Sequence, residues 1–129
     1  MKGKLALGFA GLVLLLVAVP LFAHHSFTAV YNTDKVVSVE GKLTQFMFRN
    51  PHSFVHVDVK EEDGTMTRYS VEWAGAGQLA LDGVSGNSLR PGDHVIVTGN
   101  PGRNPEDHRL RMKTLTRPSD GLKWGGTFQ

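Results

Sequence analysis

Short runs in which apolar and polar side chains alternate occupy most of the chain between residues 36 and 116. A period of two places successive side chains on opposite faces of a β-strand. Glycine, proline, asparagine and aspartate separate the runs, as is typical of turns between strands. The pattern predicts an all-β domain with five strands, at residues 36–48, 53–60, 66–73, 94–99 and 109–116.

The first predicted strand contains two irregularities. Gly41 lies inside it, which favours a sharp bend or bulge that lets one strand join two sheets. The apolar phase changes after Leu43, because Phe46 and Phe48 fall on the opposite parity. A second bulge is therefore predicted near residues 44–45, and the dipeptide at residues 50–51, Asn-Pro, ends the strand.

The second and third strands are predicted to form a hairpin whose apolar face enters the core. A turn at residues 63–65 would pair residues whose numbers sum to 128, which sets His56 opposite Glu72 and Asp58 opposite Ser70. The side chains predicted to be buried are Val55, Val57, Val59, Tyr69, Val71 and Trp73.

Between the third and fourth strands, residues 75–82 contain Leu79 and Leu81 between glycines, which predicts a short helix. The order β-β-β-α-β-β with a long bent first strand is that of a small five-stranded OB-like barrel, placed at residues 36–116. An SH3-like barrel or a simple meander would have the same number of strands. Residues 117–129 read as a Gly-rich C-terminal tail whose order is doubtful.

The N-terminal 23 residues have the three parts of a secretory signal peptide. Lys2 and Lys4 precede an apolar run at residues 5–19, and Ala23 provides the small residue of a signal-peptide cleavage site. Cleavage after Ala23 would leave residues 24–35 as an N-terminal segment and place the domain in the periplasm. Alternatively, uncleaved residues 5–23 approach the ~20 residues of a transmembrane helix and would anchor the protein in the membrane.

Charge and cysteine content restrict the partners of this domain. Removing Lys2 and Lys4 leaves 12 basic residues (14 minus 2) against 12 acidic ones. The absence of a basic excess argues against nucleic acid as a partner. The chain contains no cysteine, so we expect the core to hold the fold without disulfides.

Several motifs together resemble an exported bacterial family, domain of unknown function 6152. They are Ala-His-His-Ser-Phe at residues 23–27, Phe-x-Phe-x-Asn-Pro-His at 46–52, Glu72, the run Asn-Ser-Leu-Arg-Pro-Gly-Asp-x-Val-x-Val-x-Gly at 87–99, and Asp-Gly at 120–121. Phe48 stands where that family usually has tryptophan. The resemblance covers residue 24 to about residue 124. It implies a secreted β-barrel domain and brings no known activity or cofactor.

Histidines provide the candidate metal site. If cleavage follows Ala23, the α-amine and imidazole of His24 can chelate one ion in the manner of a histidine brace. A third nitrogen from His25 or His52 would complete a set that suits Cu(II). The alternative is an incidental histidine pair at a flexible end. His52 and His56 would lie about 13 Å apart on their strand, too far to share an ion.

The outer face of the second and third strands is the candidate ligand-binding face. It carries Phe54, which either anchors a partner or packs under the N-terminal segment through Phe27 or Tyr31. His52 has an alternative role in capping a turn, and His56 one in a cross-strand pair. No catalytic motif is recognised, so the leading hypothesis is a non-enzymatic exported binding or accessory domain for an envelope component, a peptide or a small ligand. The residues assigned to this face are His52, Phe54, His56, Arg68 and Glu72.

Overall fold

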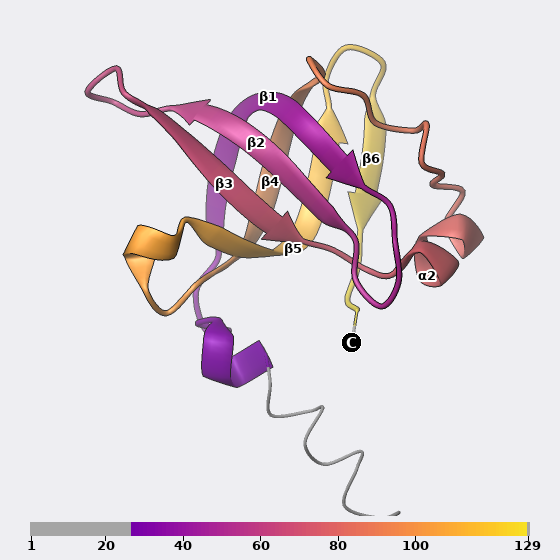
Figure 1. Cartoon of the computed structure of the whole chain (residues 1–129), viewed down its shortest axis with the longest axis horizontal. Coiled ribbons are helices and arrows are strands. Elements are labelled where there is room, and N and C mark those ends of the chain that lie inside the picture. The colour runs from indigo at the N-terminus through magenta and orange to yellow at the C-terminus, as the bar shows by residue number, and fades with distance from the viewer. Residues whose placement is uncertain (1–26, 129) are drawn as a thin grey trace, which may run out of the picture.

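The computed structural model describes residues 27–128, which form a small β-barrel with short helical elements (Figure 1). The predicted signal peptide, the alternative anchor at residues 5–23, and His24 and His25 lie outside the described residues. The elements are β1 (Val37–Met47), β2 (Phe54–Lys60), β3 (Met66–Glu72), α2 (Ala76–Leu81), β4 (His94–Pro101), η1 (Pro105–Asp107), β5 (Arg109–Arg117) and β6 (Leu122–Gly125).

Pairing of the first five strands closes the barrel. The strand order is β3-β2-β1-β4-β5-β6, and a parallel pairing of β3 with β5 joins the two ends of the five-stranded part. All neighbouring pairs in that order are antiparallel. With α2 between β3 and β4, this is the predicted OB-like arrangement, and the fold prediction is confirmed. Within residues 27–128, no helix has both the length and the apolar character needed to cross a membrane.

Strand β1 bends at the glycine and bulges where the apolar phase changes. Gly41 pairs with Val59 of β2 on one side and with Val95 of β4 on the other. A β-carbon at this position would lie 2.1 Å from the Asp58 carbonyl oxygen, so only glycine permits the close approach of β2. The register of β1 and β2 shifts between Leu43 and Gln45, which confirms the predicted second bulge.

We expect Gly41→Ala to destabilise the barrel by about 1–3 kcal/mol, because the new methyl group must push β1 and β2 apart. Urea unfolding monitored by circular dichroism measures the change. Gly77→Ala in α2 is the matched control, since its β-carbon would meet nothing nearer than the Asn50 side-chain oxygen at 3.9 Å. If both variants unfold at the same urea concentration, the backbone contact at Gly41 does not constrain the barrel.

The predicted apolar face of the hairpin forms the centre of the core. Five of its six predicted members are buried: Val55, Val57, Val59, Val71 and Trp73. Tyr69 is half-buried and packs against this core. The two leucines of the predicted helix differ in exposure: Leu79 is buried, whereas Leu81 is 88% exposed.

The hairpin register differs from the prediction by two residues. Paired numbers sum to 126, so Glu72 lies opposite Phe54, His56 opposite Ser70, and Asp58 opposite Arg68. The cause is a loop of five residues, 61–65, closed by hydrogen bonds from Glu61 N–H to the Thr65 carbonyl and from Gly64 N–H to the Glu61 carbonyl. A shift of two residues leaves every side chain on its predicted face.

The C-terminal residues contain a strand that the sequence analysis did not predict. Strand β6 pairs with β5, with Trp124 opposite Leu115. The Trp124 ring packs edge-on against Trp73 with centroids 5.2 Å apart, and its Nε1 donates a hydrogen bond to Asp82. Phe128 is 2% exposed. Residues 122–128 are therefore part of the folded domain.

Candidate functional site

The segment before β1 folds back along the barrel. Residues 27–30 are helical, and Tyr31 forms an isolated bridge with Gly102. The Asn32 N–H donates to the Pro101 carbonyl at 2.8 Å, and the Arg103 N–H donates to the Val30 carbonyl at 2.9 Å. Tyr31 is only 1% exposed, so it anchors the segment in the domain.

Glu72, at the end of β3, holds two side chains from distant parts of the sequence. The Tyr31 hydroxyl donates to Glu72 Oε2 at 2.5 Å, and His52 Nδ1 lies 2.7 Å from Glu72 Oε1. Burial raises the pKa of Tyr31, and the Glu72 carboxylate raises it further. Tyr31 therefore remains a phenol and a hydrogen-bond donor throughout the ordinary pH range.

Aromatic rings enclose His52 from two sides. The Phe27 ring centroid lies 5.5 Å from that of His52, the Phe128 centroid lies 5.8 Å away, and the two phenyl rings meet edge-on. The Arg111 guanidinium lies 3.9 Å from the Phe27 centroid and donates to the Phe128 carbonyl oxygen. Burial lowers the pKa of Arg111, and the charge of Glu72 opposes this effect. We call this group the Glu72 cluster: Phe27, Tyr31, His52, Glu72, Arg111 and Phe128.

The predicted binding face divides into two parts. His52 and Glu72 belong to the Glu72 cluster, which the N-terminal segment covers. The other three predicted residues, Phe54, His56 and Arg68, lie on the open outer face of β2 and β3. The site that sequence reasoning treated as one surface is therefore a covered cluster next to an open face.

On the open face, charged groups pair with one another. Arg68 donates two hydrogen bonds to Asp58, at 2.7 and 3.0 Å. Burial lowers the pKa of His56, and the charge of Arg68 lowers it further. Phe54 is half-buried under the Arg49 guanidinium, which lies 5.3 Å from its ring centroid. Among the described residues, no ring contact joins Phe54 to Phe27 or Tyr31, and the role of Phe54 as an anchor for a partner stays a prediction.

Within residues 27–128, no group of three or more histidine, aspartate and glutamate side chains is arranged to hold a metal ion. His52 is the described member of the predicted ligand set, and His24 and His25 lie outside the described residues. A complete metal site would need donors from that outer segment.

Sequence reasoning identified the aromatic pair Phe27 and Tyr31 as able to bury the segment, but it missed Arg111 and Phe128. Arg111 lies in an ordinary alternating strand and gives no local signal. Phe128 was one of three apolar residues in a polar tail, and that spacing was the only available indication.

Comparison with known proteins gives one family and no described activity. Residues 12–111 match the profile of a family of unknown function, DUF6152. No curated protein matches the chain.

Proposed function

We propose that this chain, which belongs to the family of unknown function DUF6152, is an exported binding protein. The proposed ligand is Cu(II). The ligands of the ion are His24, with its α-amine and imidazole, together with His25 or His52. The observation that supports the proposal is the packing of Phe27 against His52, with ring centroids 5.5 Å apart. It means that the N-terminal segment runs to the side of the barrel where His52 lies.

Chain length then limits how far the proposed ligands can be from one another. Residue 24 precedes Phe27 by three positions, and an extended chain spans at most about 3.6 Å per residue. The α-carbons of residues 24 and 27 are thus within about 11 Å of each other. This distance is short enough for an N-terminal imidazole and amine to meet the His52 side chain at one ion.

The partner of His52 also fits a metal ligand. Histidines that bind metals usually donate the second ring N–H to a carboxylate, which fixes the tautomer and the ring orientation. His52 makes this contact through Nδ1 to Glu72, and the Tyr31 hydroxyl holds the other oxygen of the same carboxylate. Cu(II) binds well to sets of nitrogen donors. An α-amine with a pKa near ~7.7–8.0 loses its proton readily when such an ion binds.

Calorimetric titration with Cu(II) tests the proposal. We expect the protein that begins at His24 to bind one ion, and a form whose His24 α-amine is acetylated to bind about 100-fold more weakly, because the amine can no longer act as a ligand. His52→Ala should weaken binding by about 10–100-fold.

His94→Ala is the matched control, because His94 is exposed and pairs with Glu40 at 2.7 Å on another part of the barrel. Electron paramagnetic resonance of the loaded protein should show coupling to one more nitrogen than the acetylated form shows. Equal, weak binding by all four proteins would mean that the histidines are ordinary surface ligands, and the copper proposal would be wrong.

The start of the exported protein is a separate prediction. We expect the mass of the protein recovered from the periplasm to correspond to a chain that begins at His24, because Ala23 is the small residue at the predicted cleavage site. Intact-mass spectrometry measures it directly. A mass that still includes Lys2 and the apolar run would contradict both cleavage and the amine ligand.

Binding of an envelope component, peptide or small ligand through Phe54, His56 and Arg68 stays a prediction. The geometry supports it less than it supports metal binding. Arg68 is engaged by Asp58, and Phe54 by Arg49, so a partner would have to displace contacts that are already made.

A further inference from the structure

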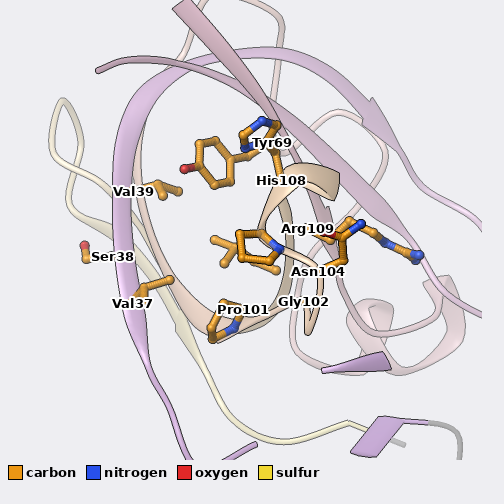
Figure 2. A pocket seen from close by; sticks show the side chains of 11 residues that line it. Val37, Ser38, Val39, Tyr69, Pro101, Gly102, Asn104, His108 and Arg109 are labelled. Atoms are coloured by element: carbon orange, nitrogen blue, oxygen red, sulfur yellow. The ribbon is translucent and has the colours of Figure 1, made fainter. Parts of the chain in front are cut away.

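One end of the barrel contains a cavity of about 220 Å³ (Figure 2). Its lining residues Gly102 and Arg109 contact Tyr31, so it borders the Glu72 cluster. Val37 and Val39 of β1 line it on one side, and the Tyr69 ring of β3 lines it on another. The loop between β4 and β5 supplies the remaining wall. The His108 ring packs edge-on against Tyr69, with centroids 5.5 Å apart.

Two strands that border this cavity have backbone edges without a neighbouring strand. Strand β1 pairs with β4 from Val37 onward, but its pairing with β2 begins only at Gly41. Residues 37–40 of β1 therefore have one unpaired edge within the described chain. Strand β3 pairs with β5 only from Ser70 onward, so residues 66–69 also have one unpaired edge there.

Most residues along the unpaired part of β1 are exposed to solvent. Val37 is 37% exposed although it points to the same side as Val39, which is 8% exposed. Ser38 and Glu40 are exposed as well. Unpaired strand edges of this kind are templates for a further strand, because every second residue offers both an N–H and a carbonyl group.

The size and lining of the cavity indicate what such a strand would insert. Pockets for complete small ligands usually measure about 300–1,000 Å³, so a cavity of about 220 Å³ is better matched to one bulky side chain. The lining is mostly apolar, with Val37, Val39, Pro101, Pro105 and Leu110. Burial raises the pKa of Tyr69, and Glu61 raises it further, so the Tyr69 hydroxyl brings no charge to the wall.

We propose that this end of the barrel docks an extended segment of another polypeptide, which adds to the unpaired edge of β1 and places one apolar side chain in the cavity beside Tyr69. Main-chain hydrogen bonds to residues 37–40 supply the attraction, and the cavity selects the side chain. A peptide is the occupant because main-chain donors and acceptors on both bordering edges match another main chain, which a purely apolar small molecule lacks. This inference is independent of copper binding.

The probe is a blocked hexapeptide of alternating threonine and leucine, titrated into the ¹⁵N-labelled protein and followed by nuclear magnetic resonance. We expect shifts concentrated at Val37, Val39, Tyr69 and His108. Val37→Glu should weaken binding by about tenfold or more, because it places a carboxylate at the mouth of the cavity. Val36→Glu is the matched control, since Val36 is 57% exposed and does not line the cavity.

Two further ligands separate the possible results. N-methylation of the leucines should weaken the hexapeptide by about tenfold, because it removes main-chain donors. If N-acetyl-leucine amide binds as tightly as the hexapeptide, the cavity takes small apolar molecules and strand addition is wrong. Absence of shifts at the four residues up to millimolar peptide, or equal effects of the two glutamate variants, would also overturn the proposal.

Discussion

Substitution of Trp73 by alanine should lower the free energy of unfolding by ~3–5 kcal/mol. Trp73 is completely buried, and its ring packs against Phe46 at 5.7 Å and Trp124 at 5.2 Å between centroids. Its removal leaves a cavity between β3, β1 and β6 that such short elements cannot readily close. Because small domains often have stabilities near ~5 kcal/mol, a large unfolded fraction is expected at room temperature.

Trp73→Phe separates ring packing from the indole nitrogen. Trp73 Nε1 is buried without a hydrogen-bond partner among the described residues, so replacing the indole by phenyl removes a polar group that is costly to bury. We expect this variant to lose less than about 2 kcal/mol. Urea unfolding monitored by far-ultraviolet circular dichroism measures both variants. Equal losses would mean that a phenyl ring restores none of the packing, and the explanation by ring volume would be wrong.

The second large effect is expected at Glu72, where Glu72→Leu should cost about 2–4 kcal/mol. The substitution leaves the Tyr31 hydroxyl and the His52 Nδ1 without their shared acceptor. It also removes the carboxylate whose charge opposes the effect of burial on Arg111. The N-terminal segment should then detach, which increased protease cleavage between residues 27 and 35 would report.

Two further variants test whether the loss of stability in Glu72→Leu comes from the hydrogen bonds of the Glu72 cluster. Tyr31→Phe removes one hydroxyl and retains the ring, so a loss of about 1 kcal/mol is expected. Asp58→Asn breaks the exposed pair with Arg68 and should change stability by less than about 1 kcal/mol. If Glu72→Leu proves as mild as Asp58→Asn, Glu72 does not hold the segment on the barrel.

Strands β1 to β5 could be predicted because each has a local pattern that the core enforces. Val55, Val57 and Val71 are completely buried, as the period of two requires. The hairpin register could not be fixed in the same way, because pairings that differ by two residues bury the same faces. The five-residue turn that decides between them is held by backbone hydrogen bonds at Glu61 and Gly64, which composition does not reveal.

The candidate site was predictable only where its residues gave a local signal. His52 follows the Asn-Pro that ends the first predicted strand, and Phe27 and Tyr31 are aromatic residues of the N-terminal segment. The contact of Glu72 with Tyr31 joins residues 41 positions apart, and that of Arg111 with Phe128 depends on the path of β6. Such contacts follow from the closure of the barrel, which one sequence does not specify residue by residue.

The edge-on contact of Phe27 with Phe128 has a practical consequence for handling the protein. It brings both ends of the described chain to the same side of the barrel, next to His52. A hexahistidine tag after Gln129 would begin two residues beyond Phe128 and would place additional imidazoles beside the proposed copper ligands. A C-terminal tag should therefore be removed before any metal titration.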